Sequence, residues 1–78
     1  MSYREELKYR TVKAIHSSGS KGISLYKICA EVFSTEDIWD MGVDMNIVFK
    51  ILDELLKEGR IFIADKSKII KEYKMKLY

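Results

Sequence analysis

Residue types that perform catalysis are sparse in this chain of 78 residues. His16 is the single histidine and Cys29 the single cysteine, so the chain can form neither an internal disulfide nor a zinc site of thiolates. The acidic residues of segment 34–43 lack the spacing of a calcium-binding loop. No nucleophile–base pair, carboxylate pair or glycine-rich phosphate loop is visible. The sequence therefore predicts a protein that is not an enzyme and holds no metal or cofactor.

Polar residues suited to recognition are spaced regularly between positions 44 and 58. Wound at about 100° per residue, this segment gathers its apolar side chains on one broad arc: Met45, Ile47, Val48, Ile51, Leu52 and Leu55. The opposite side carries a narrow stripe at positions i, i+4, i+7 and i+11, namely Asn46, Lys50, Asp53 and Lys57. Phe49 and Leu56 border this stripe. Asn46 is the only amide side chain in the sequence. The stripe is therefore expected to point away from the core.

Two further helices are predicted ahead of this segment. Helical spacing of Tyr3, Leu7, Thr11, Ala14 and Ile15 indicates a first helix over residues 3–16, capped by Ser2 and ended by the run 17–20. His16 then lies in the last turn, where a cation suits the helix dipole.

The second helix is predicted over residues 25–33. Its apolar residues recur at i, i+3, i+4, i+7 and i+8, and Ser24 is its expected N-cap. Cys29 is expected to be a small core residue. A short extended stretch over 21–23 precedes this helix.

A connector over residues 34–43 is expected to contain one helical turn, over 35–41, ended by Gly42. Asp44 is the predicted N-cap of a helix over 45–58, and Gly59 supplies the left-handed residue at its end. The hydrophobic period then changes to two, which predicts strands over 60–64 and 72–78 around a polar hairpin tip at 65–68.

The net charge of +2 conceals a strong asymmetry. Residues 1–29 carry six Lys or Arg and two Glu, and residues 59–78 carry six Lys or Arg and two acids. Residues 30–58 carry two Lys and eight acids. Because a duplex is a dense line of phosphates, the two basic ends suit contact with nucleic acid. The alternative is a lysine-rich surface in contact with water alone.

The order helix, short strand, helix, helix, strand, basic tip, strand resembles the winged helix–turn–helix family across nearly the whole chain. The resemblance is carried by Gly22-Ile23-Ser24-Leu25 and by the stretch from Ile51 to Phe62, which is similar to the family's join between third helix and wing. It implies an α+β fold: a small winged helix–turn–helix with three main helices and a C-terminal β-hairpin wing over about 60–78. The connector 34–43 departs from the family, whose turn is usually shorter.

This resemblance implies double-stranded DNA as the partner and transcriptional regulation as the task. The third helix would enter the major groove, where Asn46 pairs with adenine, Lys50 donates to guanine and Phe49 touches a thymine methyl. Phosphate contacts would come from the wing, the first helix and the third helix, that is from Lys66, Lys68, Lys71, Arg10, Lys13 and Lys57. The plainer alternative for Asn46 is a tolerated surface residue.

A second hypothesis is a protein–protein interaction module of a replication or transcription assembly. The acidity of residues 30–58 favours it, because carboxylates facing phosphate cost affinity. Its partner would contact Trp39, Phe49 or the acidic connector, although a core position for Trp39 is favoured in so small a domain. RNA binding is a third possibility, against which stands the lack of an aromatic platform on a sheet face.

Composition sets further expectations. With 78 residues the chain allows a single domain over 1–78 and a small core. No charge-poor apolar run of about 20 residues is present, and the start of the sequence resembles no signal peptide, so no membrane segment and a cytoplasmic location are expected. Scarce amides with abundant Lys, Glu and Ile indicate an archaeal or viral source from a hot habitat. Tyrosines near both ends suggest a homodimer through the first helix.

Overall fold

A computed structural model describes residues 2–33, 41–64 and 70–76. Its elements are α1 (Tyr3–Ser18), the 3-10 turn η1 (Gly19–Lys21), β1 (Ile23–Ser24), α2 (Leu25–Val32), α3 (Met41–Lys57), β2 (Ile61–Ile63) and β3 (Glu72–Met75). The protein is thus an α+β chain with three α-helices and an antiparallel sheet in these residues. The predicted types and order of the elements are confirmed. Three predictions lie outside the described residues: the helical turn over 35–41 (except for its last residue, Met41), the hairpin tip 65–68 and the position of Trp39.

Side-chain caps begin the first two helices as the sequence predicts. The Ser2 hydroxyl accepts from the Glu5 amide at 3.2 Å, and the Ser24 hydroxyl accepts from the Lys27 amide at 3.4 Å. Each bond satisfies an amide that has no partner within its helix. α1 continues to Ser18, two residues past the predicted end, and α2 ends at Val32 with Phe33 as its C-cap.

The start of α3 differs from the prediction. Asp44 was expected to cap a helix beginning at Met45, and Gly42 to end a separate turn, but both lie within α3, which begins at Met41. In the sequence, the apolar spacing of Met45, Val48 and Leu52 also includes position 41 at i−4, a pattern that is compatible with one continuous helix. Gly42 inside a helix costs only about 1 kcal/mol relative to alanine, which does not break a helix of this length.

The end of α3 is confirmed. Gly59 has φ +72°, its amide donates to the Leu56 carbonyl at 3.1 Å, and the Arg60 amide donates to the Leu55 carbonyl at 3.0 Å. These two bonds form a Schellman motif, which needs a left-handed residue where Gly59 stands. The motif turns the chain directly into β2.

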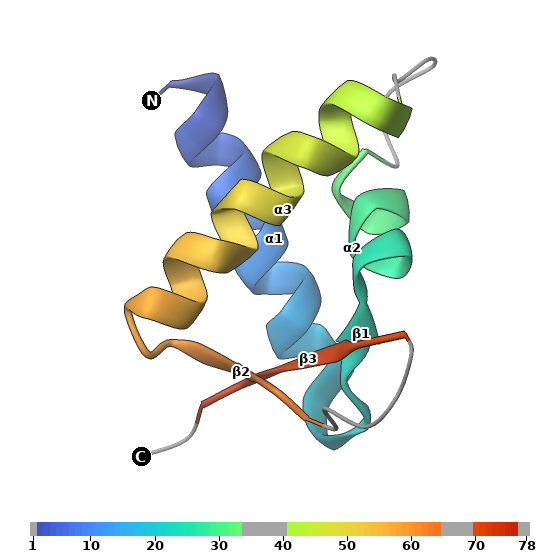
Figure 1. The fold of residues 1–78 in the computed structure, drawn as a ribbon, viewed down its shortest axis with the longest axis vertical. Coiled ribbons are helices and arrows are strands. Elements are labelled where there is room, and N and C mark those ends of the chain that lie inside the picture. Colours follow the sequence, from blue (N-terminus) through green and yellow to red (C-terminus); the bar gives the residue numbers. More distant parts are fainter. Residues whose placement is uncertain (1, 34–40, 65–69, 77–78) are drawn as a thin grey trace.

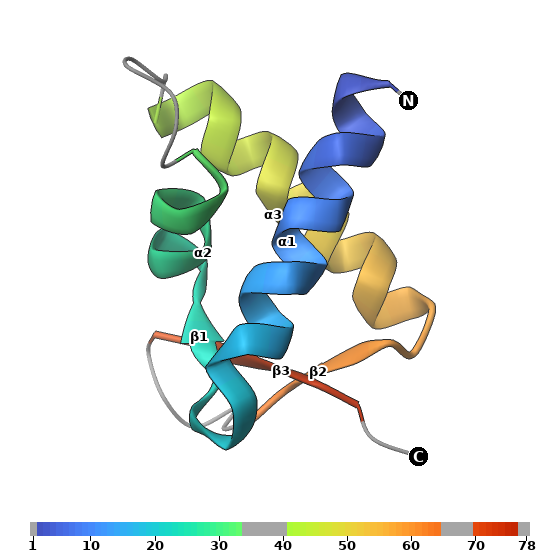
Figure 2. The same ribbon diagram turned by 180° about the vertical axis from the view of Figure 1, so that it is seen from behind.

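The sheet has the strand order β1-β3-β2, with both pairings antiparallel. Ile23 pairs with Tyr73, and Ile61 pairs with Met75. β2 and β3 are shorter than the predicted strands, although bonds from the Ala64 amide to Glu72 and from the Lys76 amide to Arg60 prolong the ladder at both ends. In Figure 1 the three helices lie above the sheet, with α3 in front of α1 and α2 to one side. Figure 2, from behind, shows α1 in front of α3.

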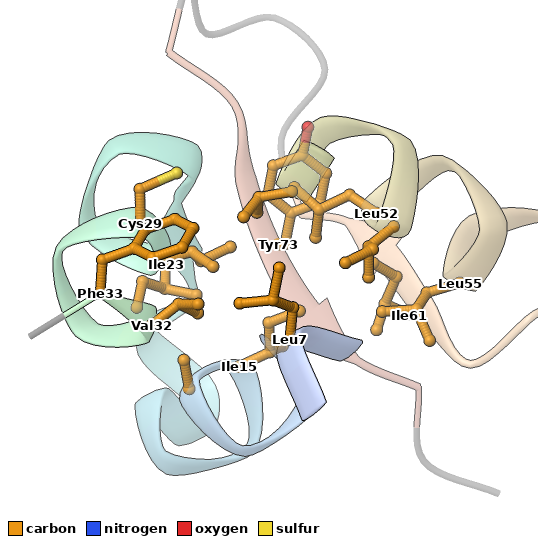
Figure 3. Packing of buried hydrophobic residues seen from close by; sticks show 14 residues of the cluster. Leu7, Ile15, Ile23, Cys29, Val32, Phe33, Leu52, Leu55, Ile61 and Tyr73 are labelled. Atoms are coloured by element: carbon orange, nitrogen blue, oxygen red, sulfur yellow. The ribbon is translucent and has the colours of Figure 1, made fainter. Parts of the chain in front are cut away.

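One hydrophobic core joins all these elements. Figure 3 shows side chains from the three helices and the sheet pointing toward a common centre. The residues that are at most 2% exposed and come from the predicted helix faces and strands are Leu7, Thr11, Ile15, Ile28, Cys29, Val32, Phe33, Val48, Ile51, Leu52, Leu55 and Ile61. Cys29 is therefore the small core residue that the sequence predicts. Tyr3 is an exception to its predicted face, since it is 56% exposed at the first position of α1.

Among the described helices, none combines the length and the apolar character that crossing a membrane requires.

Candidate nucleic-acid interface

The outer edge of α3 carries the three residues that the resemblance assigns to base reading. Asn46, Phe49 and Lys50 are all exposed, and Phe49 retains 53% of its accessible surface. Two turns of one helix hold them, and the same helix is anchored by Val48, Ile51 and Leu52, which are at most 1% exposed. The apolar arc therefore fixes the direction of the polar stripe. A rigid helix is the kind of element that holds recognition side chains in place.

Charges on this edge partly cancel. Lys57 lies 3.0 Å from Asp53, one turn earlier, and both side chains are more than half exposed. An exposed pair of this kind contributes well under 1 kcal/mol, so Lys57 can exchange the carboxylate for a phosphate at little cost. In the part of the chain that the structure describes, Lys50 forms no ion pair. Among the described side chains of this edge, Lys50 therefore supplies a positive charge without a neighbouring carboxylate in an ion pair.

Two other acids, Glu54 on α3 and Glu58 just past its last residue, lie on a different flank. Glu54 pairs with Arg4, and Lys8 lies between Glu54 Oε2 at 3.6 Å and Glu58 Oε2 at 3.3 Å. Arg60 approaches Glu58 Oε1 at 3.8 Å. α1 thus neutralises two carboxylates of the acidic middle segment and keeps them on the side of α3 that faces α1.

Arg10, expected on the DNA backbone, is engaged within the fold. Its Nη2 lies 2.7 Å from Glu6 Oε1, and its Nη1 donates to the Val32 carbonyl at 3.1 Å. Val32 is the last residue of α2, so this bond satisfies a carbonyl at the helix end. Arg10 therefore ties α1 to α2.

Lys13 is exposed one turn after Arg10. Both line a hollow of about 520 Å³ between α1 and α2, together with Ser17 and Glu31, and no residue of α3 contributes to that lining. Since α1 lies behind α3 (Figures 1 and 2), the structure does not group Arg10 and Lys13 with the outer edge of α3.

Lys71 is exposed immediately before β3. Lys71 precedes Glu72, which pairs with Ser24, the N-cap of α2. Lys27 is exposed in the first turn of α2 and was not singled out from the sequence. Its place off the apolar side of the second helix was the available signal. Lys66 and Lys68 lie outside the described residues, as do the acids at 36, 37 and 40.

Groups suited to other chemistry are buried or scattered. Cys29 is fully buried and His16 is exposed in the last turn of α1. Burial raises the pKa of the Tyr73 hydroxyl above its ordinary value, which keeps this group neutral. The described residues include no cluster of three or more His, Cys, Asp or Glu with the geometry to hold a metal ion.

Comparison with protein-family models, with curated proteins and with solved structures finds no match to this chain, so no family is shown for it.

Proposed function

We propose that this chain is a winged helix–turn–helix domain that binds double-stranded DNA and serves as a transcriptional regulator. The order of helices and strands is the one that the resemblance implies, and β2 and β3 form the antiparallel pair expected of a wing. The Schellman motif at Gly59 joins the third helix to that pair through the short turn 58–60.

The observation that carries the proposal is the sorting of charge around α3. Asn46, Phe49 and Lys50 are exposed on its outer edge, whereas Glu54 and Glu58 are paired with cations of α1. The strongest sequence argument against DNA was the acidity of residues 30–58. For these two acids that argument is removed, because their charge is compensated and directed toward α1 and not outward.

In this proposal α3 enters the major groove with its polar edge against the bases. Asn46 pairs bidentately with adenine, Lys50 donates to guanine, and Phe49 contacts a thymine methyl. Lys57 exchanges Asp53 for a phosphate. Lys66, Lys68 and Lys71 of the wing segment hold the backbone, joined by the exposed Lys27 of α2. Arg10 is assigned to the fold.

The test is a titration of labelled duplex with the protein over a range of salt concentrations, first with random duplex and then with a duplex enriched by selection. Lys50→Ala is expected to weaken binding to the selected duplex about tenfold or more, in line with about 1–3 kcal/mol for a good base contact, and random duplex far less. Replacing Lys66 and Lys68 with Ala is expected to weaken both and to flatten the salt dependence.

Lys13→Ala is the matched control, because it removes an exposed lysine from the junction of α1 and α2. Equal losses from Lys50→Ala and Lys13→Ala would contradict the placement of α3 in the groove. No affinity for any duplex at moderate salt would instead favour the protein-interaction hypothesis, for which the exposed ring of Phe49 is the specific observation.

The predicted homodimer through α1 remains part of the proposal. Tyr9 and Tyr3 on that helix are 63% and 56% exposed, and tyrosine rings are common at interfaces. Sedimentation at micromolar concentration tests it: a monomer there would remove the dimer.

A further inference from the structure

A second concave site lies away from the outer edge of α3. It is a hollow of about 890 Å³ where the C-terminal ends of α1 and α3 meet β2 and β3. In Figures 1 and 2 these four segments converge at the sheet end of the molecule. Sites for small molecules in proteins usually measure about 300–1,000 Å³, so this hollow has the size of a ligand site.

The walls of the hollow are mainly apolar. Ile15 comes from α1, Leu56 from α3, Ile61 and Phe62 from β2, and Met75 from β3. Phe62 is 42% exposed, and Leu56 and Met75 are half-buried. Apolar surface in a concave site gains free energy when a hydrocarbon covers it.

The polar part of the lining is cationic. Lys74 and Lys76 alternate along β3 and its continuation, so they project to the same side of the sheet, and His16 is contributed by α1. Among the residues that the structure describes, no carboxylate lines the hollow, and neither lysine forms an ion pair. Within the described residues, the site thus joins apolar side chains to lysines that form no ion pair.

Gly22 leaves room for the side chain of Lys74. A Cβ at Gly22 would lie 3.3 Å from Lys74 Cγ and Cε and from Glu72 Cβ, so the absence of a side chain lets the stem of Lys74 lie against the chain that leads into β1. The lysine stem is thereby packed while its ammonium group remains available to a ligand.

We propose that this hollow binds an amphipathic monoanion: an aliphatic or aromatic carboxylate whose hydrocarbon contacts the accessible surface of Leu56, Phe62 and Met75 and whose carboxylate meets Lys74 or Lys76. Charge complementarity excludes a cationic amphiphile. A duplex is a poor occupant, because its backbone is a polyanion without a hydrocarbon part to fill an apolar wall. The inference does not depend on DNA binding.

The experiment is a titration of the ¹⁵N-labelled full chain with dodecanoate, followed by amide chemical shifts. Shifts are expected at His16, Gly19, Leu56, Phe62 and Met75, with saturation below millimolar concentration. Dodecyltrimethylammonium has the same chain length with opposite charge and is expected to bind at least tenfold more weakly. Acetate, which has the charge without the hydrocarbon, is expected to cause no saturable shift.

The double variant Lys74→Gln/Lys76→Gln is expected to bind dodecanoate five- to tenfold more weakly. Its control is Lys13→Gln/Lys27→Gln, which changes the net charge equally at exposed sites outside the hollow and should bind as the unmodified chain does. Both variants alter exposed or half-exposed side chains, and the amide spectrum without ligand reports whether each is folded.

Several results would overturn the proposal: no saturable shift with dodecanoate, equal binding of the cationic amphiphile, shifts centred on residues outside the hollow, or equal affinity of the two double variants. An acidic amphipathic peptide that shifts these amides when dodecanoate does not would assign the hollow to a protein partner instead. Loss of duplex binding by Lys50→Ala has no bearing on these outcomes, so the two proposals fail separately.

Discussion

Lys8 on α1 donates to Glu58 just past the last residue of α3, with 3.3 Å between Nζ and Oε2. The two residues are fifty positions apart in the chain and belong to its basic and acidic segments. Together with Arg4 and Glu54 they form a bridge of ion pairs between α1 and the end of α3, in which cations of the basic segment neutralise carboxylates of the acidic segment. The basic N-terminal segment is therefore in part a counterion for α3, and not simply a surface for phosphates.

This bridge predicts a gain in duplex affinity when its acids are neutralised. In the double variant Glu54→Gln/Glu58→Gln, Arg4 and Lys8 lose their partners and the repulsion of phosphates beside α3 falls. Binding to random duplex at low salt is expected to strengthen about three- to tenfold, with a steeper salt dependence. Stability should fall by less than about 1 kcal/mol per pair, because the carboxylates are more than 40% exposed.

Glu5→Gln/Glu31→Gln is the control for that charge change. It also removes two exposed acids, but neither residue lies on α3. Fluorescence anisotropy over a salt series compares the two variants. If both gain the same affinity, the bridge has no specific effect and only net charge matters.

Arg10 is predicted to matter for stability. Arg10→Ala removes the ion pair with Glu6 and leaves the Val32 carbonyl without its donor from α1. The guanidinium is about one-third exposed, so the loss is expected at about 1–2 kcal/mol in the free energy of unfolding. Lys13→Ala, one turn away, should change it by less than about 0.5 kcal/mol. Urea denaturation followed by circular dichroism measures the stability of both variants. Similar midpoints would show that the contacts of Arg10 with Glu6 and Val32 do not stabilise the fold.

Gly22 and Gly19 form a matched pair for backbone strain and crowding. Both have positive φ, +78° and +59°, so alanine is strained at either position, at roughly 1–3 kcal/mol. Only at Gly22 would the new Cβ also crowd Glu72 and Lys74 at 3.3 Å, since nothing lies within 4 Å at Gly19. Gly22→Ala is therefore expected to cost roughly 1 kcal/mol more than Gly19→Ala. Thermal unfolding of both variants measures the two losses of stability. A larger loss for Gly19→Ala would show that crowding against β3 does not add to the cost at Gly22.

The burial of the Tyr73 hydroxyl predicts a loss of stability at alkaline pH. Burial raises the pKa of its hydroxyl above the ordinary 10.0, so the folded state favours the neutral phenol. Its contribution to stability is fully present below about pH 10 and is lost as the pH rises through the folded pKa, with a limiting slope of about 1.4 kcal/mol per pH unit. Urea titrations between pH 8 and 11 should show this decline, and Tyr73→Phe should reduce it. An unchanged slope in Tyr73→Phe would assign the decline to other groups.

The local elements were determined by the sequence itself. Ser2 and Ser24 are small hydroxyl residues directly before apolar periodicity, Gly59 follows the last turn of α3, and the alternation around Tyr73 indicates a strand; all four lie as predicted. These features depend on neighbours within a few residues, so a linear pattern contains the information. The predicted start of α3 was wrong because it depended on the same kind of local signal. Asp44 is a common N-cap and Gly42 a common helix end, but both lie inside the continuous helix α3.

Only the tertiary structure decided how distant charges meet. The sequence contains the acids of α3 and the cations of α1, but an ion pair requires two helices to cross at a particular angle and height. That crossing follows from the burial of Leu7 and Ile15 in the same core cluster as Ile51, Leu55 and Tyr73, which no spacing within one segment specifies. It turned Glu54 and Glu58 toward α1, engaged Arg10 at the end of α2, left Lys50 without an ion pair among the described residues, and shaped the open hollow beside Lys74 and Lys76.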